Sequence, residues 1–326
     1  MEFLLAEWLG KPAWMWLGFL IIVGVLLTLD LGVLHRKQTE IGVRESLLLS
    51  AGYMTLGVSF AGLVWWQLGA EASVEYLTGF VVEKSLALDN VFVIALIFSF
   101  FAIPRQYQHR VLFWGILGVI VLRAIMIGVG ATLVSEFSWV LYIFAAFLVL
   151  TGVKMLTMGH KEVDFSKSPV LTFIRKHFRV TEALHGDRFL VTQPDAKTGR
   201  MARHMTPLLL ALILIEIADV VFAVDSVPAI FAITTDPYIV YTSNIFAILG
   251  LRALYFALAA VLHRFAYLKQ ALAILLIFIG SKVFVADLLG LEKFPAAWSL
   301  SITFAILAAG IFYSLWRTRQ TTQSAA

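Results

Sequence analysis

Cysteine is absent from this chain of 326 residues, and charged residues make up only 14% of it. The lack of cysteine excludes disulfides, thiolate metal sites and cysteine nucleophiles. The scarcity of charge excludes an ordinary soluble domain, in which about a quarter of the residues are charged. The hydrophobic segments also contain no Ser-His pair or phosphate-binding loop. The sequence therefore predicts a protein that is not an enzyme and holds no prosthetic group.

Hydrophobic residues are abundant instead, at 60% of the chain, and the mean hydropathy is +0.89. A helix needs about 20 apolar residues to cross a bilayer. The sequence predicts an all-α polytopic membrane protein of about nine transmembrane helices. The expected spans are 14–34, 47–70, 76–102, 110–132, 137–157, 205–231, 240–262, 268–289 and 296–316.

The basic residues between spans are distributed unevenly. Nearly all of them follow spans 1, 3, 5, 7 and 9, whereas the opposite loops contain only Lys11 and Lys293. The positive-inside rule therefore places the N-terminus outside and the C-terminus in the cytoplasm. The net charge of +4 is explained by this topology, so no nucleic-acid partner is expected. The lipid bilayer is the expected surrounding.

Two parts of the chain resemble each other. Each contains, in order, an acid, a second acid followed by a small polar residue, an arginine and a Gly-x-Lys sequence. The matched residues are Glu83, Asp89, Asn90, Arg123 and Lys154 in the first part, and Asp219, Asp225, Ser226, Arg252 and Lys282 in the second. Each repeat has three spans, and an odd number inverts the second repeat relative to the first. Inverted repeats typically place a transport site near the midplane.

This repeat divides the chain into five segments. Residues 1–70 contain accessory spans 1 and 2, and 71–157 form the first three-helix repeat, spans 3–5. Residues 158–204 form a basic cytoplasmic loop, expected to be a linker. Residues 205–289 form the second, inverted repeat, spans 6–8. Residues 290–326 contain accessory span 9 and a cytoplasmic tail.

Intramembrane carboxylates are costly, about 3 kcal/mol each, so they usually have a function. Besides the four repeated acids, Glu216 lies three residues before Asp219 and shares its helix face. Asp30 lies near the cytoplasmic end of span 1, where it can equally be interfacial. Acids six residues apart point about 120° apart on an ideal helix. Pro228 is expected to break span 6 beside Asp225 and free a backbone carbonyl.

Structural ion pairs are the alternative explanation of these acids. Five bases also lie within the predicted spans: Lys84, Arg123, Lys154, Arg252 and Lys282. They can nearly neutralise the bundle in a protein that transports nothing. Arg123 and Arg252 are expected to hold carboxylates in place, and Lys154 and Lys282 lie near span ends and can extend toward water.

The ion type follows from the available ligands. All seven histidines lie in or beside the cytoplasmic segments, outside the acidic core. Carboxylate, amide and carbonyl oxygens favour Mg²⁺, Ca²⁺ and Mn²⁺ over zinc and copper. The sequence therefore predicts a hard divalent cation.

Three segments, Glu83–Val93, Phe222–Ala232 and Thr242–Ala253, resemble the signatures of the TerC/Alx family of bacterial integral membrane proteins. This resemblance implies an inner-membrane protein of the LysE-like transporter superfamily, linked to Mn²⁺ export. It assigns the metal role to Glu83, Asp89, Asn90, Asp219, Asp225 and Ser226, and extends it to Asp30, Glu216 and Asn244.

The resulting hypothesis is a Mn²⁺ exporter that works by alternating access and is coupled to H⁺, because protons and Mn²⁺ compete for the same carboxylates. Two alternatives stay open. One is a Ca²⁺/H⁺ exchanger. The other is a membrane accessory factor that docks a protein partner through loop 158–204 or supplies metal to client proteins.

Overall fold

The computed structural model describes residues 6–32, 43–157, 168–194, 199–258, 268–291 and 294–324. The helices are α2 (Ala13–Gly32), α3 (Val43–Leu68), α4 (Ala70–Phe100), α5 (Arg105–Glu136), α6 (Val140–Thr157), α7 (Pro169–His177), α8 (Pro207–Phe231), α9 (Pro237–Leu249), α10 (Leu251–Leu258), α11 (Leu268–Leu288) and α12 (Ala296–Ser324). Two antiparallel hairpins pair β1 (Glu7–Trp8) with β2 (Lys11–Pro12) and β3 (Leu190–Pro194) with β4 (Met201–Met205).

The all-α polytopic membrane fold is confirmed. Seven helical segments within the described residues are long and apolar enough to cross a bilayer. The apolar part of α2, Ala13–Leu29, is shorter. Helix α4 is not among the seven and carries Glu83, Lys84 and Asp89 in its middle, although its 31 residues would extend about 46 Å. The count of nine spans and their orientation stay predictions.

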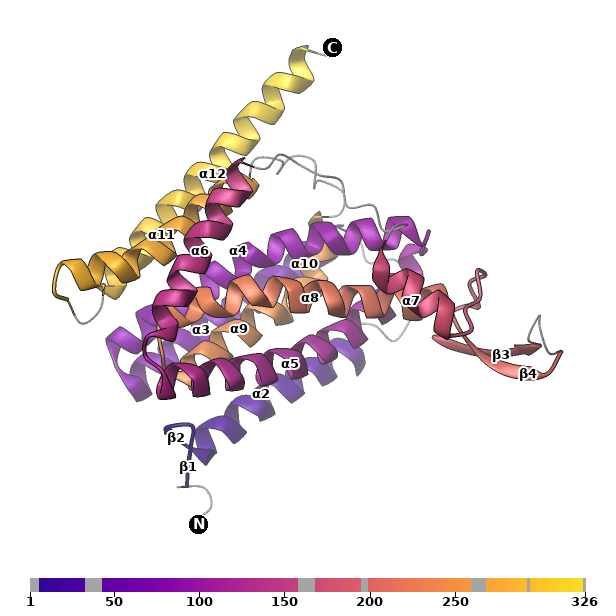
Figure 1. Ribbon diagram of the computed structural model, residues 1–326, viewed down its shortest axis with the longest axis horizontal. Coiled ribbons are helices and arrows are strands. Elements are labelled where there is room, and N and C mark those ends of the chain that lie inside the picture. Colours follow the sequence, from indigo (N-terminus) through magenta and orange to yellow (C-terminus); the bar gives the residue numbers. More distant parts are fainter. Residues whose placement is uncertain are drawn as a thin grey trace.

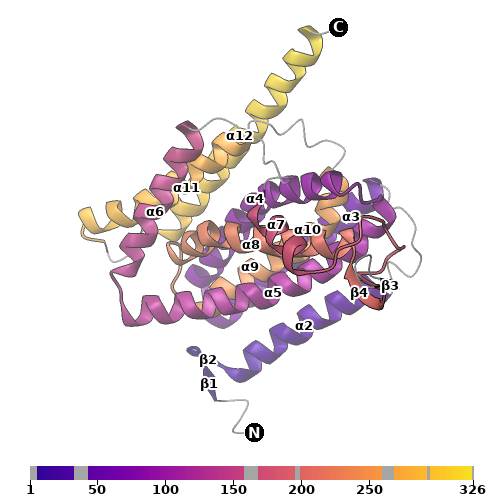
Figure 2. The same ribbon diagram turned by 45° about the vertical axis from the view of Figure 1, so that its right-hand side comes forward.

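The bundle has a central group of helices with accessory helices on two sides (Figures 1 and 2). Helices α4, α5, α8 and α9 pack together, while α6, α11 and α12 lie along one side and α2 along another. Helix α4 packs against α9, and α5 packs against α8. In the two predicted repeats α4 is the equivalent of α8, and α5 is the equivalent of α9. The α4–α9 contact of one repeat order is therefore the α8–α5 contact of the other. The packing therefore has the pairing expected of a pseudo-twofold axis.

Helices α6 and α11 end the two repeats, and equivalent residues of these helices make equivalent close contacts. A methyl group on Gly152 would lie 2.6 Å from the carbonyl oxygen of Ala273. One on Gly280 would lie 2.5 Å from the carbonyl oxygen of Ala145. Each glycine thus contacts the residue seven positions before the other glycine. This reciprocal contact is antiparallel, as inversion of the repeats requires.

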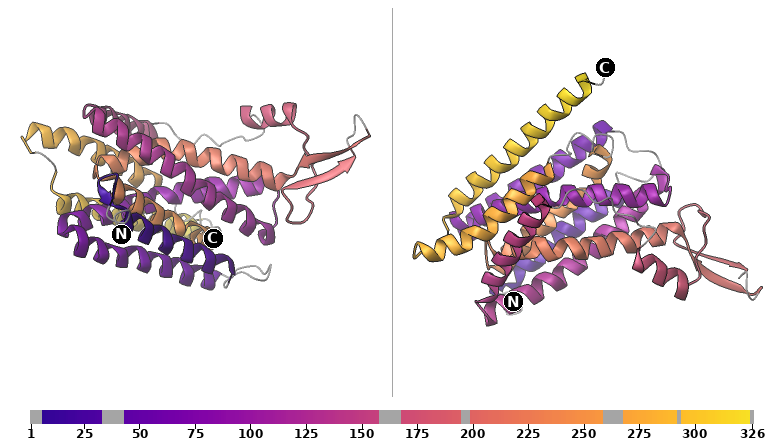
Figure 3. Two further views of the ribbon diagram at one scale, coloured as in Figure 1. Left: turned by 90° about the horizontal axis from the view of Figure 1, so that it is seen from below. Right: turned by 45° about the horizontal axis from the view of Figure 1, so that its top comes forward.

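The segment 158–204, expected as a linker, is partly folded, so that expectation is corrected for residues 168–194 and 199–204. Helix α7 is amphipathic, and its Leu171 and Ile174 are buried beside Leu208 of α8. The β3–β4 hairpin extends beyond the end of the bundle (Figure 3). Thr206 donates a hydrogen bond to the carbonyl of Arg188 at 2.7 Å. Apolar residues within the polar loop thus form a small module that packs against the helix ends.

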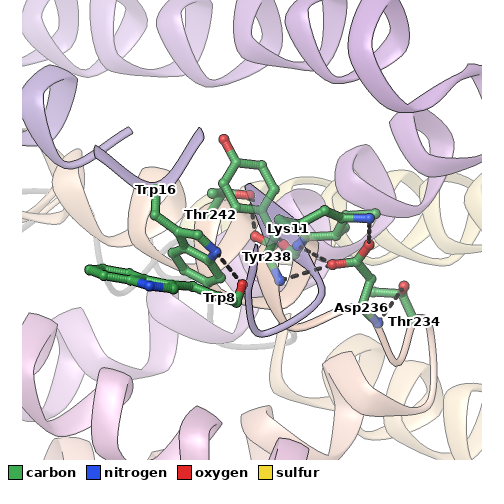
Figure 4. A network of polar contacts seen from close by, with 8 residues as sticks. Trp8, Lys11, Trp16, Thr234, Asp236, Tyr238 and Thr242 are labelled. Atoms are coloured by element: carbon green, nitrogen blue, oxygen red, sulfur yellow. Dashed lines mark hydrogen bonds and ion pairs between the residues drawn. The ribbon is translucent and has the colours of Figure 1, made fainter. Parts of the chain in front are cut away.

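The β1–β2 hairpin lies at the opposite end of the bundle (Figure 1). The Lys11 ammonium lies 2.7 Å from the Asp236 carboxylate (Figure 4). Asp236 also caps α9 by accepting a hydrogen bond from the backbone N–H of Tyr238 at 2.9 Å. The Trp16 indole donates to the carbonyl of Trp8 at 2.8 Å and meets the Tyr238 ring edge-on. These contacts attach the hairpin and α2 to the start of α9.

The predicted break in span 6 is wrong. Helix α8 continues through Pro228 and ends at Phe231. A proline removes a single N–H donor, and the surrounding packing can tolerate that loss near a helix end. The interruption lies in span 7 instead, where Gly250 separates α9 from α10.

Candidate functional site

Helices α4 and α8 each contribute one carboxylate to a buried arginine on α5. Arg123 Nη1 lies 2.9 Å from Glu83 Oε1. Its Nη2 and Nε each lie 3.2 Å from a different oxygen of Asp219, which makes a bidentate pair. Arg123 and Glu83 are each 1% exposed. One guanidinium therefore joins the equivalent acids of both repeats in the interior of the bundle.

Two small polar residues complete this cluster in a reciprocal way. Arg123 Nη1 donates to Ser226 Oγ at 2.5 Å, and Ser226 is also hydrogen-bonded to Glu83. The Asn90 amide donates to Asp219 Oδ1 at 3.5 Å. Asn90 is the equivalent of Ser226, and Glu83 is the equivalent of Asp219. Exchanging the repeats therefore converts the Asn90 contact into the Ser226 contact, which places the pseudo-twofold axis between α4 and α8.

Glu216 lies against the backbone of α5, one turn before Asp219. A methyl group on Gly118 would lie 2.3 Å from Glu216 Oε1, so only glycine leaves room for this carboxylate. Gly115, one turn earlier, is in ordinary van der Waals range of the same oxygen. Glu216 and Asp219 are close enough to interact electrostatically. Two α5 glycines thus allow a third acid into the cluster.

A cavity of about 40 Å³ lies beside these acids, with Asn90 and Asp219 in its wall. Gly115 also lines it, and the remaining lining side chains are apolar residues of α4, α5, α8, α9 and α10. This volume can hold a water or a small partly dehydrated ion. It lies on the side of the cluster toward the start of α5 and α8, which the charge pattern predicts to be cytoplasmic.

Three buried oxygens on the acids and on Asn90 are unused among the described residues. Glu83 Oε2, Asn90 Oδ1 and Glu216 Oε2 have no hydrogen-bond partner among the described residues. Buried polar atoms in proteins nearly always have a partner, so these oxygens are free to accept hydrogen bonds or to bind a cation. No group of three or more His, Asp or Glu residues is arranged to hold a metal within the described part of the chain.

Asp225 points away from the arginine cluster. It is hydrogen-bonded to Thr151 and interacts electrostatically with Lys154, both on α6. The structure therefore separates Asp219 from Asp225, as their expected 120° offset on an uninterrupted helix requires. The four repeated acids were expected to form one bipartite site, and the structure brings Glu83 and Asp219 together without Asp225.

The remaining predicted residues are placed as follows. Asn244 of α9 is fully buried, and neither of its amide atoms has a partner among the described residues. Lys282 donates to Ser299 of α12 at 2.9 Å. The side chains of Asp30, Asp89 and Arg252 lie outside the described residues.

The sequence reasoning missed the role of Lys84. Its ammonium donates to the carbonyl of Ala247 at 3.0 Å, in the last turn of α9, and lies against Gly250. A cation at a helix C-terminus is stabilised by the free carbonyls and the helix dipole. The glycine at 250, within a predicted span, was the available signal for this helix end.

Comparison with known proteins agrees with this architecture. The family model described as "Integral membrane protein TerC family" matches residues 68–322. A protein from Rickettsia bellii, described as "Uncharacterized membrane protein", is 49% identical over 302 residues, covering 93% of this chain and 97% of that protein. An Escherichia coli K12 protein described as "Putative membrane-bound redox modulator Alx" is 43% identical over 316 residues, covering 94% and 95%. No solved structure matches.

Proposed function

Because this chain belongs to the TerC family of integral membrane proteins, we propose that it exports a divalent cation, Mn²⁺, by using its intramembrane carboxylates as ligands. It is a multi-pass protein of the bacterial inner membrane, as its relatives and its apolar helices indicate. The support for transport comes from the charge and geometry of the acidic cluster.

The excess of negative charge in this cluster is the observation that carries the proposal. Among the described residues it contains three acids, Glu83, Asp219 and Glu216, and one base, Arg123. When all are ionised, three negative charges and one positive charge leave two negative charges. Such an excess is costly at bilayer depth. One divalent cation would neutralise it.

The cavity supplies the expected binding place. Asp219 and Asn90 line it, and Glu216 lies against its Gly115 wall. Carboxylate and amide oxygens are ligands that Mn²⁺ accepts, and Ca²⁺ accepts them as well. Mn²⁺ is preferred here because the sequence resemblance described above implies Mn²⁺ export, and a Ca²⁺/H⁺ exchanger is the competing assignment.

The exchanged packing of the two repeats supports a mechanism of alternating access. The cavity lies on the predicted cytoplasmic side, so this arrangement suits uptake of the ion from the cytoplasm. Export of one divalent ion against an interior-negative potential costs about 4.6 kcal/mol per 100 mV. Inward flow of protons onto the same carboxylates would offset that cost, because a protonated carboxylate no longer binds the metal.

Proteoliposomes that contain a Mn²⁺ indicator and a pH dye test this function. Wild type should move Mn²⁺ with an opposite flow of protons, and Asp219→Asn should lower the flux at least about 10-fold, because one buried acid is lost. Glu136→Gln, an exposed acid at the end of α5, is the matched control and should leave flux unchanged. Absence of Mn²⁺ flux in wild type refutes export, and flux of Ca²⁺ alone establishes the Ca²⁺ alternative.

The folded module of α7, β3 and β4 favours a second candidate, an accessory role in which this module docks a protein partner. Two large apolar side chains on it, Phe173 and Phe178, are 57% and 50% exposed. Replacement of both by serine should abolish a docking role and leave Mn²⁺ flux intact. If the double variant loses Mn²⁺ flux but still binds its protein partner, the result argues against a docking role for these two side chains.

A further inference from the structure

Arg123 holds the position that a cation would take between the equivalent acids of the two repeats. Its guanidinium contacts Glu83 from α4 and both oxygens of Asp219 from α8. It is 1% exposed, although it heads the fully buried side chains of the described residues by volume. A buried charge at this depth persists only when it is paired and hydrogen-bonded. The arginine is therefore held by the acids, and the acids are neutralised by the arginine.

A metal ion cannot use these acids fully while the arginine is in place. The guanidinium takes one oxygen of Glu83, both oxygens of Asp219 and the hydroxyl of Ser226. The oxygens left without partners among the described residues are the second oxygen of Glu83, Asn90 Oδ1 and Glu216 Oε2. Only Asn90 of these three residues lines the cavity, and the three oxygens are too few for the six or more oxygens that a hard divalent cation collects. The positively charged guanidinium and a metal cation bound at the same acids would also repel each other.

We propose that Arg123 is a tethered competitor of the transported cation: the entering ion displaces the guanidinium from Asp219, and the returning guanidinium expels the ion. This inference rests on the proposed export function. It assigns Arg123 a positioning role that controls release, in addition to the structural pairing of the acids. The same residue connects α4 and α8, so its displacement also loosens the contact between the two repeats.

A cation that is part of the protein would stabilise the empty carrier while it returns to the conformation that binds the next ion. After the metal has left, the carrier must change conformation with its acids empty, and unpaired carboxylates at bilayer depth make that step unfavourable. The guanidinium is always charged and forms bidentate pairs with carboxylates, so it can neutralise the empty site. Lysine, with a single compact ammonium, cannot hold Asp219 through two hydrogen bonds.

Mn²⁺ binding to the purified full chain in detergent, measured by calorimetry, separates this role from simple structural support. Arg123→Gln should bind Mn²⁺ at least about 10-fold more tightly than wild type, within the usual range of coupling between two ligands. The same variant should transport at least about 10-fold more slowly in proteoliposomes, because release of the ion is impaired. A purely structural arginine predicts the opposite, weaker binding together with lower transport, and that result overturns the proposal.

Two further variants keep the experiment decisive. Arg110→Gln removes a cation that pairs with Asp187, outside the acidic cluster, and its Mn²⁺ affinity should equal that of wild type. If Arg123→Gln cannot be purified folded, Arg123→Lys is measured instead. It should bind Mn²⁺ about 2- to 5-fold more tightly, because one hydrogen bond to Asp219 is lost while the charge is kept. Unchanged or weaker binding by Arg123→Lys contradicts the proposal. A wild type that neither binds nor moves Mn²⁺ refutes the export function itself.

Discussion

The reciprocal glycine contact between α6 and α11 leads to a paired prediction. In Gly152→Ala the new methyl group would lie 2.6 Å from the Ala273 carbonyl oxygen, and in Gly280→Ala it would lie 2.5 Å from the Ala145 carbonyl oxygen. Both obstacles are backbone atoms, which can move only if the helices separate. Overpacking of this kind costs about 1–3 kcal/mol, and alanine recovers about 1 kcal/mol through its better helix propensity. Since a rigid backbone places the cost at the upper end, each variant should lose about 1–2 kcal/mol of unfolding free energy.

Unfolding in mixed micelles with increasing SDS, followed by tryptophan fluorescence, measures this loss. Gly128→Ala is the matched control, because a methyl group there has no atom within 4 Å, and it should match or exceed wild-type stability. The two substitutions should cost nearly the same, because exchange of the repeats converts one contact into the other. Wild-type stability in both variants would refute the close approach of α6 and α11. A large loss in one variant alone would refute the pseudo-twofold relation.

Three further predictions concern single contacts. Gly118→Ala should weaken Mn²⁺ binding at least about 10-fold in calorimetry, because the methyl group displaces the Glu216 carboxylate from the cavity edge; unchanged affinity would exclude Glu216 as a ligand. Asp236→Ala should destabilise the protein by about 1 kcal/mol in the SDS assay through loss of the α9 cap, whereas Asp236→Asn should keep most of that stability; equal losses would show that the ion pair matters more than the cap. Arg110→Ala should cost no more than about 1 kcal/mol in the same assay, since its ion pair with Asp187 is partly exposed, and a larger loss would show that the module depends on this contact.

The acidic cluster was partly predictable from the sequence. The repeat matched Glu83 with Asp219 and Asn90 with Ser226, and the structure brings all four together around Arg123. The matching succeeds because equivalent residues of inverted repeats meet at their shared axis. Sequence spacing alone gives no crossing point for two helices, so the reciprocal contacts themselves could not be derived.

Other features depended on neighbours that lie far away in the chain. Glu216 was expected to share a face with Asp219, but its place against Gly118 depends on how α5 packs onto α8. Asp225 was grouped with Asp219, yet it faces Thr151 and Lys154 on α6. A break was expected in span 6 at Pro228, but the helix interruption lies in span 7 at Gly250. There Lys84 of α4 donates a hydrogen bond to the end of α9.

The sequence by itself determined the class of the protein, its apolar helices and its duplicated acids. These depend on hydrophobic length, charge distribution and residue order, and all three are local properties of the chain. Only the tertiary structure decided which acids share an arginine, where a cavity remains and which backbone atoms come within contact distance. The physical reason is that the residues on a helix face do not specify which other helix packs against that face. Asp219 and Asp225 are both acids of one predicted span, and only the packing directs Asp219 to Arg123 and Asp225 to α6.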